Sequence, residues 1–256
     1  MMYFFAKIFK GPFFFVLTKK RCFVYCLFMA LIGTLVGTMI MISSYATNGS
    51  NNAPLSIIVD AGHGLPDGGA VGITGCIEQE INLEIALKLQ EVLEAKDINV
   101  IMTRKDENGL WQDANSSIRE KKLEDMNNRL DIMKKSCAQL FVSIHMNSFP
   151  NHSATGLRIF YSPNHPDIKP LAENIQVRIQ DITGANATIV KSADKSLFLM
   201  KNPPLPAILV ECGFLSNPKD ESKLQTEDYQ ARLAWAIADA IEKYYILPQN
   251  QPQVDF

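Results

Sequence analysis

The stretch from Ile57 to Gly64 constrains the fold most, because it joins an apolar run directly to a glycine-containing turn. Ile57-Ile58-Val59 runs into Asp60-Ala61-Gly62-His63-Gly64. A continuous apolar run predicts a strand that is covered on both faces, and the glycines predict a tight turn after it. In open α/β sheets, ligands bind beyond the carboxyl ends of the strands. His63 is therefore a candidate functional residue, although a single histidine in this position is more often structural.

Strand-like and helix-like segments alternate along the rest of the chain. The expected strands are Leu55–Val59, Asn99–Thr103, Leu140–His145, Leu157–Tyr161, Leu197–Met200 and Ala207–Glu211. The expected helices are Glu78–Ala95, Ser117–Lys135, Ile168–Asp181 and one within Asp220–Tyr245. This alternation predicts a single α/β domain, with a mixed, mostly parallel sheet of about six strands and helices on both faces. The chain has 256 residues, enough for one such core and a leader.

The N-terminal region predicts export. Basic residues precede Cys22–Ile42, which carries no charge and is long enough to span a bilayer as a helix. The basic side is expected to stay in the cytoplasm. Ser44 and Ala46 have the spacing of a signal-peptidase site, so this segment is either a signal anchor or a cleaved signal peptide. We expect a leader over 1–46, a linker over 47–54, a catalytic domain over 55–246 and a tail over 247–256.

Charge and cysteine content argue against several classes of protein. The net charge is −2 at pH 7, so the chain lacks the basic excess of nucleic-acid-binding domains. The five cysteines form no CxxC pair, which argues against both a disulfide framework and a cysteine zinc site. Cys76 and Cys212 stay of interest because each lies close to an acidic residue that is discussed below.

Two more predicted strands end in a side chain that can carry chemistry. The apolar strand that begins at Leu140 ends at His145, and the strand that begins at Ala207 ends at Glu211. A carboxylate directly after Ile-Leu-Val would be buried, so Glu211 must be paired or neutral. His145 has the simpler alternative of a packing or capping role.

Acidic residues also stand at the start of the first predicted helix. Glu78 and Glu80 follow Cys76-Ile77, where acids can simply complement the helix dipole. Taken together with the strand ends, however, the chain offers two histidines and a carboxylate from separate segments. Such a set leaves an open fourth position on a tetrahedral zinc, and a second carboxylate can act as a base beside it.

Five motifs, in this order, resemble a known family. They are Val59-Asp60-Ala61-Gly62-His63-Gly64, Asp67-Gly68-Gly69-Ala70-Val71-Gly72, Glu78-Gln79-Glu80-Ile81-Asn82-Leu83, Ser143-Ile144-His145-Met146-Asn147 and Leu209-Val210-Glu211-Cys212-Gly213-Phe214-Leu215-Ser216-Asn217. They are similar to the zinc-dependent N-acetylmuramoyl-L-alanine amidases of the amidase 3 type. The resemblance runs from about Ser56 to Tyr245. It departs at Glu80, where the family usually has Asp, and at Cys212, where it often has Val or Ala.

The resemblance implies a role for each residue. His63, Glu78 and His145 would bind one zinc ion, and Glu211 would be the catalytic carboxylate. The family ligand is the first acid of a Glu-x-acid-x-Asn stretch, and Asn82 fixes that register on Glu78. The implied reaction is hydrolysis of the amide between N-acetylmuramic acid and L-alanine in peptidoglycan. Zinc would activate water, and Glu211 would take its proton and pass one to the departing amine.

A short enzyme with an N-terminal membrane segment is most similar to the germination-specific, spore-cortex subgroup. The stretch Glu120–Arg129 is also similar to that subgroup. The likeness implies removal of the peptide from muramic acid, so that a deacetylase can form muramic δ-lactam in the cortex. The implied partners are peptidoglycan strands, an accessory or deacetylase protein and a membrane, but no nucleic acid. The implied location is outside a bacterial membrane, anchored or secreted, in the forespore cortex space.

Three alternatives stay open at this point. A zinc peptidase that cuts the stem peptide would use the same metal chemistry on a neighbouring amide. A non-catalytic wall-binding module is less consistent with a complete set of ligands and Glu211. A cysteine hydrolase would use Cys76 or Cys212, and chelator sensitivity with resistance to thiol reagents would dismiss it.

Overall fold

The computed structural model describes residues 29–34 and 54–246. The chain divides into two units, Met1–Ala53 and Pro54–Phe256. Of the predicted membrane segment Cys22–Ile42, only 29–34 is described, and it is helical. None of the helices in the described ranges is long and apolar enough to cross a membrane. The predicted tail, 247–256, and nearly all of the predicted linker lie outside the described residues.

Six strands form one mixed sheet in the order β2-β1-β3-β6-β4-β5. Their bounds are β1 Ser56–Ala61, β2 Asn99–Met102, β3 Leu140–Asn147, β4 Leu157–Tyr161, β5 Ala187–Ser192 and β6 Ala207–Phe214. Only β4 and β6 are antiparallel neighbours, and the other neighbouring pairs are parallel. This confirms the mixed, mostly parallel six-stranded sheet that was predicted.

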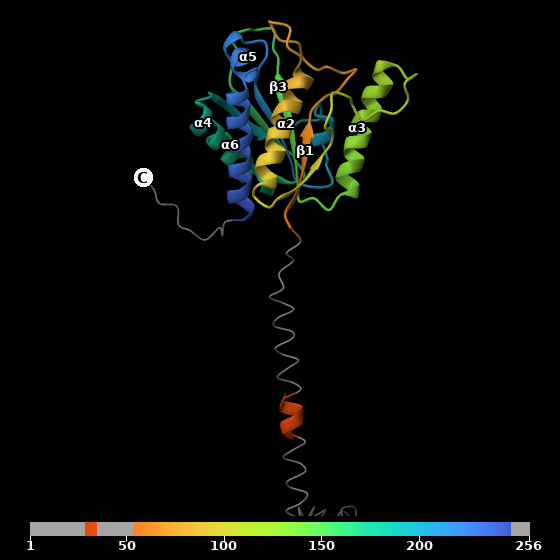
Figure 1. Ribbon diagram of the computed structural model, residues 1–256, viewed down its shortest axis with the longest axis vertical. Helices are drawn as coiled ribbons and strands as arrows, with labels where there is room; N and C mark the ends of the chain where they lie inside the picture. The colour runs from red at the N-terminus through yellow and green to blue at the C-terminus, as the bar shows by residue number, and fades with distance from the viewer. Residues whose placement is uncertain (1–28, 35–53, 247–256) are drawn as a thin grey trace, which may run out of the picture. The chain divides into compact units, whose positions relative to one another are not determined.

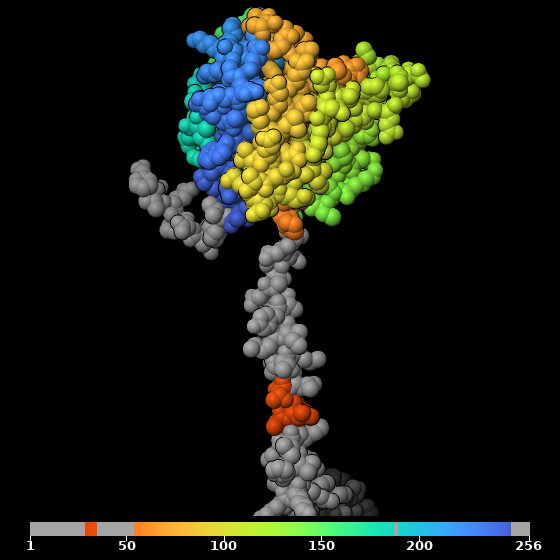
Figure 2. Space-filling model, viewed as in Figure 1, coloured from red at the N-terminus to blue at the C-terminus, as the bar shows by residue number. Residues whose placement is uncertain are grey.

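Helices cover both faces of the sheet, as predicted (Figure 1). Their bounds are α2 Glu78–Glu94, α3 Ile118–Lys135, α4 Lys169–Thr183, α5 Pro218–Leu224 and α6 Glu227–Tyr245, with short 3-10 helices η1 Pro166–Ile168 and η2 Phe198–Met200. The apolar faces of α2, α4 and α6 pack on one side of the sheet, whereas α3 and η2 pack on the other. In the space-filling view, α2 and α6 lie side by side on one surface (Figure 2).

Side chains of each strand alternate between the two cores, and this alternation positions the site. Phe141 of β3 and Leu209 of β6 both belong to the core beneath α3 and η2. Because strand side chains repeat every second residue, His145 and Glu211 lie on that same face. His145 and Glu211 are also direct partners across β3 and β6. The carboxyl ends of β1, β3 and β6 therefore meet at one edge of the sheet.

The structure corrects two predictions of secondary structure. Leu197–Met200 is not a strand: Phe198–Met200 forms η2, after a turn in which the Asp194 carboxylate accepts a hydrogen bond from the Ser196 amide at 2.8 Å. The sixth strand is instead β5, which was missed although Thr188-Ile189-Val190 is β-branched throughout. The helix predicted within Asp220–Tyr245 is α6, and the short helix α5 precedes it from Pro218.

Candidate metal centre

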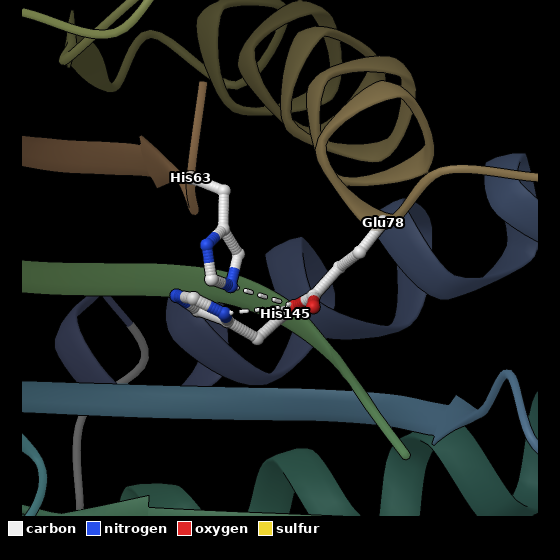
Figure 3. Close-up of side chains that lie close together, drawn as sticks. All are labelled: His63, Glu78 and His145. Carbon is white, nitrogen blue, oxygen red and sulfur yellow. Dashed lines mark hydrogen bonds and ion pairs between the residues drawn. The ribbon is translucent and has the colours of Figure 1, made fainter. Parts of the chain in front are cut away.

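Three side chains from separate elements meet at the carboxyl edge of the sheet (Figure 3). His63 lies in the turn after β1, Glu78 is the first residue of α2, and His145 lies on β3. The Oε1 atom of Glu78 lies 3.3 Å from Nε2 of His63 and 3.0 Å from Nδ1 of His145. One donor atom from each residue can be chosen so that all three lie within 4.8 Å of one another. The structure thus brings together the three ligands expected from the sequence.

Two glycines allow these side chains to approach so closely. A Cβ atom on Gly62 would lie 2.2 Å from Nε2 of His145, so no other residue fits beneath that imidazole. Gly69 has a φ of 72°, and a Cβ atom there would lie 2.5 Å from Oε2 of Glu78. Gly62 therefore makes room for the side chain of His145.

Both oxygens of Glu78 are held by the backbone. Oε1 accepts a hydrogen bond from the Met146 amide at 3.0 Å, and Oε2 accepts one from the Ala70 amide at 2.8 Å. Burial alone would raise the pKa of Glu78, but hydrogen bonding to His145 and His63 holds that pKa well below its usual range. Glu78 is therefore an ionised carboxylate in a fixed orientation. Glu80 is exposed and lies outside the cluster.

Asp67 orients the imidazole of His63. Its Oδ2 atom lies 3.0 Å from Nδ1 of His63 and 2.8 Å from Nζ of Lys122. With Nδ1 bound in this way, Nε2 is the atom that faces Glu78. Burial would lower the pKa of His63, but the bonds to Asp67 and Glu78 raise it to about 9. Sequence reasoning missed this role of Asp67, although an acid close to a candidate ligand is a usable signal.

A buried arginine clamps the turn that carries His63. The backbone φ of His63 is 60°, a left-handed conformation that is uncommon outside glycine. Arg104 donates through Nε to the carbonyl oxygens of Ala61 and His63, both at 2.9 Å. Its Nη2 donates to the carbonyl oxygens of Gly62 at 3.0 Å and of Gln79 at 2.7 Å. Arg104 thereby ties the His63 turn to the first turn of α2, next to Glu78.

A second arginine, Arg129 of α3, supports the same turn from beneath the sheet. It is 1% exposed and donates to the carbonyl oxygen of Ala61 at 2.9 Å and to that of His63. Its charge is balanced by Asp60 and by Asp125, whose Oδ2 lies 2.9 Å from Nε. Neither arginine was singled out from the sequence, because the turn that they support lies far away along the chain.

Glu211 lies beside this cluster at the end of β6. Its Oε2 accepts a hydrogen bond from the side-chain amide of Asn147, another residue whose role was missed. Burial raises the pKa of Glu211 to about 7, although Asn147 and the charge of Arg158 oppose the shift. Such a carboxyl group can both accept and release a proton near neutral pH.

A cavity of about 300 Å³ opens onto all four residues. Its lining includes His63, Glu78, His145 and Glu211, together with the apolar residues of η2. The cavity is of a size that suits part of a small ligand.

The two cysteines that sequence reasoning left open do not join the site. Cys212 lies on the opposite face of the sheet from Glu211, and burial raises the pKa of its thiol. Cys76 donates through Sγ to Glu221 at 3.3 Å, and burial with this acidic partner raises its pKa to about 11. Neither is a reactive thiolate at neutral pH.

The donor set fits a zinc ion on chemical grounds. Two imidazoles and one carboxylate form a recurring ligand set of catalytic zinc sites, which keep an open position for water or substrate. The carboxylate of Asp67 behind His63 is the usual outer partner of such a ligand. An α/β domain with this cluster and a second carboxylate beside it defines a candidate metal-dependent hydrolase.

Comparison with known proteins identifies the family. Residues 57–243 match the Amidase_3 model, described as N-acetylmuramoyl-L-alanine amidase. The chain belongs to this family and is an N-acetylmuramoyl-L-alanine amidase, which acts on peptidoglycan.

Individual relatives agree with this assignment. The chain is 31% identical to the germination-specific N-acetylmuramoyl-L-alanine amidase of Bacillus subtilis (strain 168), over 86% of this chain and 96% of the relative. It is similar to the CwlD amidase of Clostridioides difficile, solved in complex with the GerS lipoprotein, with 40% identity and a TM-score of 0.71 over 74% of this chain and 98% of that one. The catalytic domain of CwlV from Bacillus (Paenibacillus) polymyxa is 30% identical, with a TM-score of 0.64 over 74% of this chain and 97% of that one.

Proposed function

We propose that this amidase depends on one zinc ion bound by His63, Glu78 and His145, and that Glu211 is its catalytic carboxylate. The observation that carries the proposal is the clustering of these three donors within 4.8 Å of one another, at a cavity that Glu211 also lines. When bound, zinc supplies a Lewis acid that polarises the amide carbonyl and makes a water molecule more acidic.

The protein's own groups would move the protons. Asn147 holds Oε2 of Glu211, and no described residue donates a hydrogen bond to Oε1. Oε1 is then available to take a proton from the attacking water. The same carboxyl would deliver a proton to the nitrogen of the departing L-alanine, which leaves as an amine. The raised pKa of Glu211, about 7, suits both steps.

We further propose a role in the spore cortex, in which removal of the peptide precedes formation of muramic δ-lactam. Support comes from the likeness to the germination-specific enzyme over 96% of that protein's length. The relative from Clostridioides difficile was solved with a lipoprotein. We therefore propose an accessory protein partner for this chain. The leader over 1–46, as anchor or signal peptide, would place the catalytic domain outside the membrane.

The test of the activity is digestion of purified peptidoglycan by the zinc-loaded protein, followed by mass spectrometry of the products. We expect intact stem peptides that begin with L-alanine, together with glycan strands that have lost them. Treatment with a chelator should stop the reaction, and added zinc should restore it. Shortened stem peptides would identify a peptidase instead and would overturn the proposal.

The cortex role has its own test in a deletion strain. Spores without the gene should lack muramic δ-lactam in their cortex muropeptides. Complementation with the wild-type gene should restore the lactam, and a gene encoding Glu211→Gln should not. Normal δ-lactam in the deletion strain would contradict the cortex role without affecting the assignment of the activity.

A further inference from the structure

Arg158 extends the row of site residues across the sheet. His145 of β3 is the direct partner of Glu211 of β6, and Glu211 is the direct partner of Arg158 of β4. Directly opposed residues point to the same face, with Cβ atoms about 4.5–5.5 Å apart. Arg158 therefore flanks Glu211 on the side away from the zinc-ligand candidates.

The guanidinium of Arg158 forms no ion pair within the described part of the chain, although its charge acts on the neighbouring Glu211. Its Nε atom is buried and makes no hydrogen bond, and no carboxylate of the described residues forms an ion pair with it. Its Cζ atom lies 5.0 Å from the centre of the Phe214 ring. The neighbouring carboxylate of Glu211 is bonded to Asn147 instead. A partly buried arginine with an unpaired donor favours the binding of an anion.

A second cation lies on the same face. Lys191 of β5 is the direct partner of Phe160, which follows Arg158 by two residues and so shares its face. Lys191 is exposed, its Nζ lies 5.2 Å from the Phe160 ring, and no described carboxylate pairs with it. On the other side of the cluster, by contrast, Lys122 is paired with Asp67.

We propose that Arg158, supported by Lys191, binds a carboxylate of the stem peptide on the leaving side of the scissile amide and selects peptides that carry it. This inference rests on the proposed catalytic role of Glu211. The backbone of Arg158 is two strand spacings, about 10 Å, from that of His145. An extended peptide covers that distance in about three residues. A free carboxyl group on one of the first residues after L-alanine would lie within this reach, whereas amidation of that group would remove its charge.

A guanidinium distinguishes these two forms. It can bind a carboxylate through two parallel charge-assisted hydrogen bonds, but it gains no charge interaction with a carboxamide. Alternatively, Arg158 can act only on Glu211, through the effect of the guanidinium charge on that carboxyl group. That role would affect every substrate equally, so the two roles are separable by comparing substrates.

The experiment uses the zinc-loaded full chain and two synthetic N-acetylmuramoyl peptides, which differ only in a free or amidated carboxyl on the residue after L-alanine. We expect the wild type to prefer the free acid. The Arg158→Gln variant should raise KM for the free acid about tenfold and leave KM for the amide within about twofold. Lys191→Gln should act in the same direction but more weakly, because its side chain is exposed.

Two further variants complete the design. Arg178→Gln on α4 is the matched control: Arg178 is a partly buried arginine that pairs with Asp239 on the other face of the sheet, and its loss should change neither KM. Arg158→Lys keeps the charge and should retain part of the preference. Equal losses on both peptides, or a loss in kcat alone, would overturn the inference. A wild type that cleaves neither peptide would overturn the proposed function itself.

Discussion

Glu211 is the residue on which the chemistry of the proposed mechanism depends. Its position at the end of an apolar strand explains its raised pKa, and Asn147 fixes one of its oxygens. A carboxylate with these properties can serve as a proton shuttle without contributing to metal affinity. This separation of roles leads to a test at the level of a single residue.

We predict that Glu211→Gln binds zinc as tightly as the wild type but loses about 10²-fold or more of kcat. General acid–base catalysis contributes on that scale, and glutamine keeps the shape while losing the proton transfer. Zinc content is measured by metal analysis, and turnover on purified muropeptides. Undiminished turnover in this variant would remove Glu211 from the mechanism.

Asp60 gives a second prediction at the residue scale, on stability rather than activity. It is fully buried and accepts hydrogen bonds from Ser143 and Thr103, beside Arg129. Burial alone would raise the pKa of Asp60, but the charge of Arg129 and these hydrogen bonds lower it. A folded-state pKa below the unfolded-state value means that the ionised group stabilises the fold at neutral pH. This contribution is lost as the pH falls through the folded-state pKa.

We therefore expect Asp60→Asn to lower the free energy of unfolding at pH 7 by about 3–5 kcal/mol, because Arg129 loses a buried partner. The difference from the wild type should shrink below about pH 4, where the unfolded wild type is protonated at Asp60. Urea unfolding of the metal-free protein between about pH 3 and 7 measures both quantities. A difference that is constant across this range would contradict the explanation.

At the scale of elements, the turn after β1 is held by groups from α2, α3 and the segment after β2. Arg104 contacts the carbonyl oxygens of Ala61, Gly62 and His63 and also that of Gln79 in α2. Two elements that carry proposed zinc ligands are thus connected by one planar side chain. Lysine cannot reproduce this pattern, because its single ammonium group has no fork of donors.

We predict that Arg104→Lys weakens zinc binding by about tenfold, the lower end of the usual effect of outer-sphere partners. The measurement is competition with a chromophoric chelator, and the absorption spectrum of the cobalt-substituted protein reports the ligand geometry. Arg178→Lys is the control, since it should cost some stability without changing zinc affinity. A folded Arg104→Lys protein with wild-type zinc affinity would show that the clamp has no effect on the metal site.

For the molecule as a whole, metal binding should couple to folding. The three proposed ligands come from the turn after β1, from α2 and from β3, so they are brought together only in the folded chain. A ligand that binds only the folded state stabilises it by about 2.7 kcal/mol at a free concentration 100-fold above Kd. For a domain of this size, each 1 kcal/mol shifts Tm by about 2–4 °C.

We expect EDTA to lower the Tm of the purified protein by several degrees, and zinc to restore it. Glu211→Gln should respond as the wild type does, whereas the Tm of His63→Ala should be insensitive to zinc. Differential scanning calorimetry measures these shifts. A zinc-sensitive Tm in His63→Ala, with unchanged metal content, would exclude His63 from the ligand set.

Local sequence patterns determined much of this protein by themselves. Apolar runs such as Ile57–Val59 identify buried strands, because only a strand covered on both faces tolerates them. The resemblance of Glu78–Asn82 to the Glu-x-acid-x-Asn stretch of the family favoured Glu78, which the structure places beside the two histidines, while Glu80 faces solvent. These features depend on neighbours a few residues away, so they can be recognised in the sequence without knowledge of the tertiary structure.

Other features were decided only by the tertiary structure. Arg104 acquires its role by reaching carbonyl oxygens in β1 and α2, and Asn147 acquires its role by meeting Glu211 across the sheet. Arg158 lies next to Glu211 because β4 lies between β6 and β5 and is antiparallel to β6, an order that no local pattern indicates. The physical reason is the same in each case. These groups interact across long stretches of chain, and only the packing of the sheet and helices sets which of them meet.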